Sequence, residues 1–242
     1  MKKLVYILFV LIACSCFSQP SGSGLYQGSQ YYYYITAAKN LKFCFRNEQG
    51  ENYHSISNLK QAIESKGKEL LFAMNGGMYN PNGRPTGLYV ENGFTIKKLN
   101  VITCGKTNFS MCFGTEATNG VFVITHTGIA SVVKSTQYVT NNVKYATQSG
   151  PLLLYEGEIN PKFSRTSVNY NLRNGVGIMP NGQVVMVLAE NITLYNFASI
   201  FKEKFQCQNA LYLDGAISQM YIENEDRKDL GGNFGVIIFE EK

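Results

Sequence analysis

The 242-residue sequence has only two histidines, His54 and His126, and no Cys-x-x-Cys pair. Both histidines fall in segments expected to be loops, which argues against Ser-His or Cys-His nucleophilic catalysis. Without paired cysteines, a zinc centre or a thioredoxin-like redox site has little support. The formal net charge is only +5, too small to favour nucleic-acid binding. No segment resembles the calcium-binding loop of an EF-hand.

What the sequence does contain is enough apolar material for a full core, because 45% of its residues are hydrophobic. Short apolar runs follow one another and are separated by turn pairs, which predicts β-hairpins. The turn signals are Asn92-Gly93, Asn119-Gly120, Glu156-Gly157 and Pro180-Asn-Gly182. Helical spacing occurs only at residues 57–66, with Ser57 as the expected N-cap, and at 194–205. The sequence therefore predicts a single α+β domain over residues 31–242, with a largely antiparallel or mixed β-sheet core and a few packed helices.

The first 19 residues are typical of an export signal, with two lysines, an apolar run and then small residues. That run is too short for a permanent membrane anchor. Leu11-Ile-Ala-Cys14 resembles a bacterial lipobox, which predicts lipidation of Cys14; the alternative is ordinary cleavage before Gln19. Residues 20–30, rich in serine and glycine, are predicted to be a flexible tether. Either route gives an exported protein. Lipidation predicts a cell-envelope lipoprotein, whose membrane contact would be its lipid anchor, and ordinary cleavage predicts a periplasmic or secreted protein.

One aspartate stands apart from the other charges: Asp214 ends the apolar run Leu211-Tyr-Leu213 and is followed by Gly215. A carboxylate at a strand end is held by rigid backbone and can be presented to a ligand. The alternative reading of Asp-Gly is a type I′ hairpin turn. Glu190 ends the apolar run 184–189 in a similar way. It is the candidate if a second catalytic carboxylate is required, against the alternative of a strand-end surface charge.

Five segments occur in the order seen in the phosphodiester glycosidase domain family, which the sequence resembles from about Lys42 to Phe239. They are Phe72-Ala-Met-Asn-Gly-Gly-Met-Tyr79, residues 85–93, Thr147-Gln-Ser-Gly-Pro151, Arg173-Asn-Gly-Val-Gly177 and Asn209-Ala-Leu-Tyr-Leu-Asp-Gly215 with Ser218. The resemblance is closer to the family's bacterial exported branch than to its lysosomal enzyme, the one that uncovers mannose 6-phosphate. Relatives of that enzyme tend to read Leu-Asp-Gly-Gly-Gly-Ser-Ser, whereas Ala216, Ile217 and Gln219 replace two glycines and a serine here. The replaced glycines leave less room for a ligand near the backbone.

The resemblance implies hydrolysis of a sugar 1-phosphodiester at the anomeric carbon, with release of an N-acetylhexosamine-type sugar and a phosphomonoester. A phosphate ester leaves more readily than an alcohol, so the need for a general acid is relaxed. Asp214 would then act as nucleophile, base or electrostatic partner.

The same resemblance suggests residues that bind substrate. Arg173 could grip two phosphate oxygens, or be a solvated arginine before a strand. Asn75 could donate its amide to a sugar hydroxyl, although Asn75 and Gly76 could equally form only a turn. Ser218 could bind phosphate or orient Asp214, while Gly150 and Gly215 would shape the pocket.

No cofactor is implied; the open alternative is a hard cation such as calcium held by Asp214, Glu190 and carbonyl oxygens. The expected partner is a glycan or sugar-phosphate substrate. The rival function is a non-catalytic glycan-binding envelope lipoprotein on the same scaffold.

Overall fold

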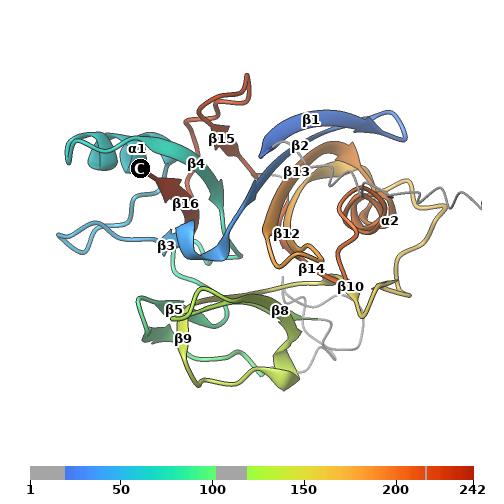
Figure 1. Cartoon of the computed structure of the whole chain (residues 1–242), viewed down its shortest axis with the longest axis horizontal. Helices are drawn as coiled ribbons and strands as arrows, with labels where there is room; N and C mark the ends of the chain where they lie inside the picture. Colours follow the sequence, from blue (N-terminus) through green and yellow to red (C-terminus); the bar gives the residue numbers. More distant parts are fainter. Residues whose placement is uncertain (1–19, 102–118, 216) are drawn as a thin grey trace, which may run out of the picture.

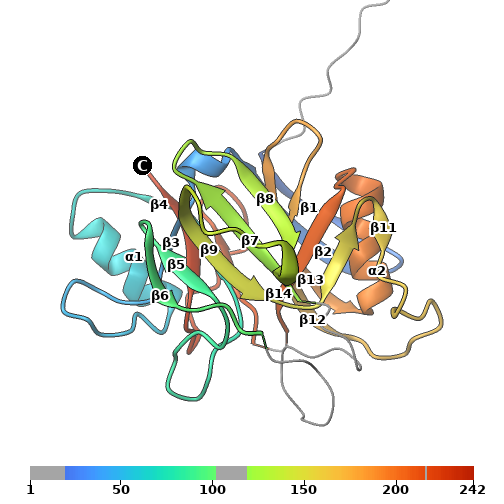
Figure 2. The same ribbon diagram turned by 90° about the horizontal axis from the view of Figure 1, so that it is seen from below.

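A computed structural model describes residues 20–101, 119–215 and 217–242 of the chain. Three antiparallel β-sheets of seven, four and five strands face a shared core, and two short α-helices cover outer faces (Figure 1). The core joins all three sheets through side chains such as Phe72, Phe122 and Met186. The five-stranded sheet packs against the seven-stranded one, with β7 (Gly120–Thr125), β8 (Ala130–Lys134) and β9 (Val143–Ser149) in contact with β14 (Asn209–Asp214) (Figure 2).

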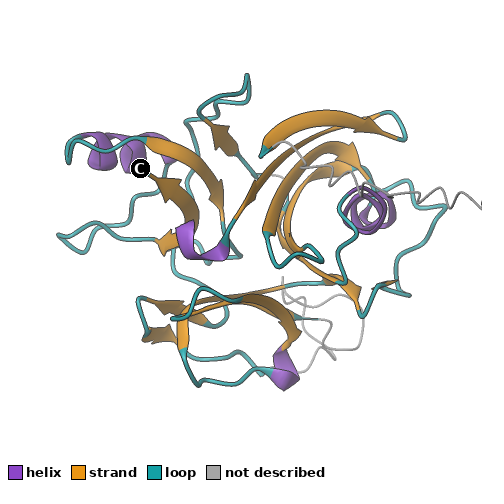
Figure 3. Cartoon of the chain, in the orientation of Figure 1, coloured by secondary structure: helices purple, strands orange, loops and turns teal. Residues whose placement is uncertain are grey.

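The seven-stranded sheet holds most of the hydrophobic runs predicted from the sequence. Its strands, in spatial order, are β1 (Ser21–Tyr26), β2 (Ser29–Thr36), β13 (Val184–Ile192), β12 (Asn171–Ile178), β14 (Asn209–Asp214), β10 (Leu152–Tyr155) and β11 (Glu158–Ile159). One face lines the shared core, and α2 (Leu194–Ser199) packs on the other (Figure 3). The predicted helix over 194–205 is thus regular only in its first half, because Ile200–Lys204 continues as a π-helical turn.

The prediction of a tether over residues 20–30 is wrong. Residues Ser21–Tyr26 form β1, which pairs along its whole length with the tyrosine-rich strand β2. The glycines of β1 allow close packing against the tyrosines of β2. A Cβ on Gly22 would lie 2.8 Å from the hydroxyl of Tyr33, and one on Gly24 would lie 2.8 Å from that of Tyr31. The Ser/Gly-rich composition, which is typical of a linker, is therefore that of a strand here, in which glycine leaves room for the aromatic rings of the neighbouring strand.

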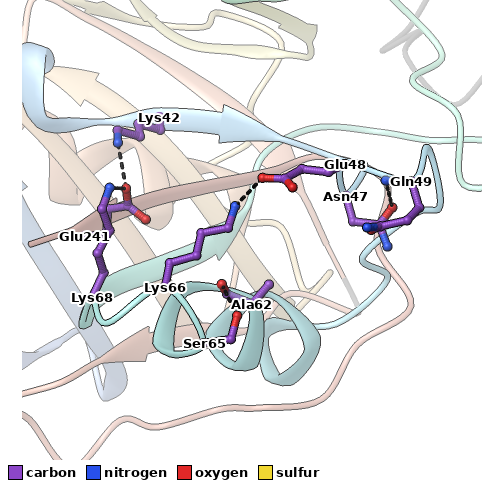
Figure 4. Close-up of polar contacts among 9 residues, drawn as sticks. All are labelled: Lys42, Asn47, Glu48, Gln49, Ala62, Ser65, Lys66, Lys68 and Glu241. Atoms are coloured by element: carbon purple, nitrogen blue, oxygen red, sulfur yellow. Dashed lines mark hydrogen bonds and ion pairs between the residues drawn. The ribbon is translucent and has the colours of Figure 1, made fainter.

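The four-stranded sheet contains β15 (Met220–Ile222), β4 (Leu70–Asn75), β16 (Ile237–Glu241) and β3 (Lys42–Cys44). Helix α1 (Ile56–Glu64) buries Ile56, Leu59 and Ile63 against it. The N-cap is Ser55, two residues before the predicted Ser57, and its side chain accepts from the Asn58 N–H at 3.1 Å. Figure 4 shows Glu241 of β16 paired with Lys42 of β3 at 2.7 Å and with Lys68 before β4 at 2.5 Å, which fastens the end of the chain to the sheet.

The five-stranded sheet follows the predicted hairpins closely. It contains β6 (Phe94–Lys97), β5 (Tyr89–Glu91), β9 (Val143–Ser149), β7 (Gly120–Thr125) and β8 (Ala130–Lys134). Strands β5 and β6 pair around Asn92-Gly93, and β7 pairs with β8. The predicted hairpins β10–β11 and β12–β13 are confirmed in the seven-stranded sheet.

The predominance of antiparallel strands is confirmed, but the α+β class fits only loosely because α1 and α2 have nine and six residues. The hairpin reading of Asp214-Gly215 is wrong, since β14 and β15 belong to different sheets. No helix in the described part of the chain is long and apolar enough to cross a membrane. The predicted signal over residues 1–19, with Cys14, lies outside the described residues.

Candidate active site

Two strand ends and the middle of a third strand, from two sheets, meet around Asp214. Asp214 is the last residue of β14, and Asn174 lies opposite it on the neighbouring strand β12. Asn75 is the last residue of β4 in the four-stranded sheet. The chain crosses from one sheet to the other between Asp214 and β15, so both sheets hold the carboxylate in place.

Asn75 is fully buried and orients this carboxylate through its side-chain amide. Its Nδ2 donates to Asp214 Oδ2 at 2.9 Å. Its Oδ1 accepts from Asn174 Nδ2 at 3.0 Å and from the Gln219 N–H at 3.1 Å. An amide oxygen accepts and an amide nitrogen donates, so two donors on Oδ1 leave Nδ2 facing Asp214. Asn75 was predicted to donate its amide to a sugar hydroxyl, and in the structure the amide donates to Asp214 instead.

The second oxygen of Asp214 is held by its own strand end, because Oδ1 accepts from the Gly215 N–H at 2.7 Å. Burial raises the pKa of the Asp214 carboxyl above its ordinary value, and the hydrogen bonds from Gly215 and Asn75 offset part of this rise. A half-buried carboxylate with one donor on each oxygen keeps lone pairs for a substrate. The arrangement suits a group that acts in its ionised form.

An open pocket of about 490 Å³ lies beside Asp214. Its lining residues are Met78, Tyr79, Asn80, Pro81, Tyr212, Asp214, Gly215 and Ile217. Among these described lining residues Asp214 is the one carboxylate. Apolar and aromatic walls around a few polar groups are typical of a small-molecule site.

Two tyrosines line this pocket, and their hydroxyls remain protonated near neutral pH. Burial and then the nearby Asp214 charge raise the pKa of Tyr79 to about 12. Burial also raises the pKa of Tyr212 to about 12, with Arg173 opposing the rise and Asp214 adding to it. Both phenols can therefore donate hydrogen bonds to sugar or phosphate oxygens.

The predicted glycines have different places. Gly215 lines the pocket, and a Cβ there would lie 2.5 Å from Tyr212 Oη, so only glycine fits without moving that ring. Gly76 and Gly150 do not line it. A Cβ on Gly76 would lie 2.5 Å from Ile238 Cγ1, and one on Gly150 would lie 2.5 Å from Asn119 Oδ1. These two glycines allow close packing beneath the site.

Ser218 is buried, with 2% of its surface exposed, and its N–H donates to the Gly215 carbonyl at 2.8 Å. Within the described residues its hydroxyl has no hydrogen-bond partner, so neither the predicted bond to Asp214 nor exposure to the pocket is seen. The backbone of Ser218 shapes the turn after Asp214.

Arg173 lies away from the Asp214 pocket. Its Nε donates to the Ile192 carbonyl at 2.8 Å and its Nη2 to the Asn169 carbonyl at 2.9 Å. Its guanidinium carbon is 5.8 Å from the centre of the Tyr212 ring. The alternative of a solvated arginine is wrong, because Arg173 is 5% exposed.

Glu190 does not join Asp214 either. It pairs with Arg227, which also contacts Asp229 at 2.8 Å, and it does not line the Asp214 pocket. The expectation that Glu190 ends its strand is wrong, because β13 continues to Ile192, and β12 lies between β13 and β14. The pairing of Glu190 with Asp214 as catalytic carboxylates, or as calcium ligands, has no support in this geometry. The described residues hold no cluster of three or more His, Cys, Asp or Glu suited to a metal.

Glu190→Gln is accordingly expected to leave kcat/KM for the hydrolysis of a sugar 1-phosphodiester, the reaction that the resemblance implies, within about twofold of the native value. Loss of a partly exposed ion pair is expected to cost less than about 1 kcal/mol of stability. Steady-state kinetics and thermal unfolding check both expectations. A folded variant whose kcat falls by about two orders of magnitude would restore Glu190 as a catalytic group.

Sequence reasoning missed three residues that form the site: Tyr79, Asn174 and Tyr212. Each lies inside a segment that carried the family resemblance, and Asn174 directly follows Arg173, which was chosen instead. Burial pattern could have separated Asn174 from Arg173, because neighbouring residues of a strand point to opposite faces.

The sequence matches a known family and a bacterial relative. A family model described as phosphodiester glycosidase matches residues 68–234. The chain is 34% identical over 186 residues to the uncharacterized protein YigE of Escherichia coli, covering 76% of this chain and 70% of that protein.

Two solved structures share the fold. The catalytic domain of zebrafish N-acetylglucosamine-1-phosphodiester alpha-N-acetylglucosaminidase, auto-inhibited by its pro-peptide, matches with a TM-score of 0.61 and 16% identity, covering 93% of this chain and 84% of that one. A putative exported protein of Burkholderia pseudomallei matches with a TM-score of 0.53 and 10% identity, covering 88% and 74%. By its sequence match over residues 68–234 and its similarity to YigE, the chain belongs to the phosphodiester glycosidase family.

Proposed function

We propose that this protein is an exported hydrolase that cleaves a sugar 1-phosphodiester, such as an N-acetylhexosamine 1-phosphate linkage, to free sugar and phosphomonoester. The observation that carries the proposal is Asp214, the one carboxylate among the described lining residues of the pocket, held by Asn75 and Gly215. Membership of the phosphodiester glycosidase family supports the reaction class.

In the proposed reaction, the bond between the anomeric carbon and the bridging oxygen breaks, and its electron pair leaves with the phosphate. Asp214 attacks the anomeric carbon or stabilises the positive charge that develops there. Water then supplies a hydroxyl group to the sugar and releases a proton. The phosphomonoester is a weak base, so it leaves without a strong general acid, which suits a pocket with one carboxylate.

The tyrosines would hold the substrate during this step. Tyr79 and Tyr212 keep their protons, because their pKa values are raised to about 12, and can donate to oxygens that gain negative charge. Ile217, where relatives of the lysosomal enzyme have glycine, lines the same pocket and narrows the space for the sugar or its aglycone.

Export is part of the proposal and depends on the first 19 residues of the sequence. The expected form is a cell-envelope lipoprotein whose membrane contact is an acyl chain on Cys14. Mass spectrometry of the mature protein distinguishes this form, which gives an acylated Cys14 peptide, from the alternative that begins at Gln19.

The test is a hydrolysis assay with a panel of N-acetylhexosamine 1-phosphodiesters, in which free sugar and phosphomonoester are measured separately. Equal molar release of both products supports the proposal. Saturable binding of the same compounds without turnover would favour the rival function, a glycan-binding envelope protein, which the replacement of two family glycines by Ala216 and Ile217 also favours.

A further inference from the structure

A separate, smaller pocket of about 140 Å³ has Arg173 in its lining, and we call it the Arg173 pocket. Its polar lining residues are Lys162, Ser164, Ser167, Asn169, Arg173 and Tyr195. Two of these are cations, and no Asp or Glu is among the described lining residues. Arg165 adds a third positive charge, 5.1 Å from the centre of the Tyr195 ring.

Arg173 itself is a buried charge with no acidic partner. It is 5% exposed, and within the described chain no carboxylate lies within ion-pair distance of it. Its two hydrogen bonds to main-chain carbonyls use two of the five guanidinium donors. Burial lowers the pKa of Arg173, with Tyr212 opposing this shift. A buried cation without a counter-charge is costly unless an anion compensates for it.

We infer that the Arg173 pocket binds a tetrahedral oxyanion, the phosphate group of a phosphomonoester or free phosphate. The two main-chain carbonyls fix the guanidinium, so its remaining donors are held in place for a ligand at little entropic cost. Serine and tyrosine hydroxyls around the pocket supply further donors for phosphate oxygens. The volume suits one such group rather than a sugar ring.

Tyr212 links this pocket to the candidate active site. It lines the Asp214 pocket, and its ring is 5.8 Å from the Arg173 guanidinium carbon. Tyr212 is therefore the residue through which an anion in the Arg173 pocket would contact the wall of the Asp214 pocket. On the proposed function, that anion is a second phosphate on the leaving portion of the substrate, or the phosphomonoester product retained after cleavage.

Isothermal titration with inorganic phosphate at constant ionic strength tests the site. Native protein is expected to bind phosphate with saturation. Ser167→Glu adds a negative charge to the pocket and is expected to weaken binding by about tenfold or more. The matched variant Ser167→Gln, of equal size and with the same hydroxyl removed, is expected to bind phosphate more tightly than Ser167→Glu, because it lacks the added negative charge. Arg173→Met, checked for folding by circular dichroism, is expected to abolish binding.

Other outcomes overturn the inference: no saturable binding to native protein, or equal binding by Ser167→Glu and Ser167→Gln. Loss of binding in Asp214→Asn but not in Ser167→Glu would place phosphate in the Asp214 pocket and also overturn it. A parallel titration with glycerol 3-phosphate separates the two sources, since tighter binding than phosphate identifies a phosphomonoester. Because no step requires turnover, failure of hydrolysis and failure of this site are distinguished.

Discussion

Replacing Asp214 with asparagine is expected to lower kcat for sugar 1-phosphodiester hydrolysis on the order of 10³- to 10⁴-fold. An amide cannot attack the anomeric carbon or offset a full positive charge, and no other carboxylate among the described lining residues can substitute. The comparison is made at saturating substrate, with both products measured. Because the variant creates an Asn-Gly pair that can revert to aspartate, the assayed sample is checked by mass spectrometry.

The pH dependence of the native activity should reveal the ionisation of the Asp214 carboxyl. The carboxyl must be ionised to act, and burial raises its pKa, so kcat/KM should fall on the acid side at a pH above the ordinary aspartate value of about 4. A rate that is constant down to about pH 4 would contradict this role.

The free energies of unfolding of the native protein and of Asp214→Asn should depend differently on pH in the same interval. A carboxyl whose pKa is higher in the folded than in the unfolded state favours folding while it is protonated. That contribution is complete below the ordinary aspartate pKa and is lost as the pH rises through the raised folded value. The difference in unfolding free energy, native minus Asp214→Asn, should therefore decrease across that interval and stay constant above it.

The local parts of the fold could be predicted from the sequence, and the long-range parts could not. Turn pairs such as Asn92-Gly93 identify hairpins because they fix both the turn geometry and the pairing of its strands. Nothing local indicates that β15 leaves β14 and pairs with β4, or that β2 pairs with β13. Those pairings depend on contacts between side chains far apart in the sequence. An example is the ring of Tyr34, which stacks on that of Phe72 with 4.4 Å between the ring centres.

The site was predictable to the same extent. The place of Asp214 at a strand end follows from the apolar run before it and the glycine after it. Arg173 and Asn174 show where that reasoning fails: opposite them on β13 are Ala189, in the core beside α2, and Leu188, in the shared core. One residue of strand register decides which side chain reaches Asn75, and the sequence motif contains both.

Asn75→Ala is expected to lower kcat/KM about 100-fold, because Asp214 loses the donor that orients it and a small misplacement of a reacting group is costly. Stability is expected to fall by about 2 to 4 kcal/mol, since a fully buried side chain with hydrogen bonds to Asp214, Asn174 and Gln219 is removed. Kinetics and denaturant unfolding measure the two effects.

A purely structural role for Asn75 would lower activity without changing its pH profile. The hydrogen bond from Asn75 lowers the pKa of Asp214, so its loss should move the acid limb of kcat/KM to higher pH. Asn160→Ala is the matched control: its Nδ2 donates to the Leu152 carbonyl at 2.9 Å, outside the Asp214 pocket. That variant should lose stability but keep the native pH profile. An unshifted acid limb in folded Asn75→Ala would show that Asn75 supports the fold without positioning Asp214.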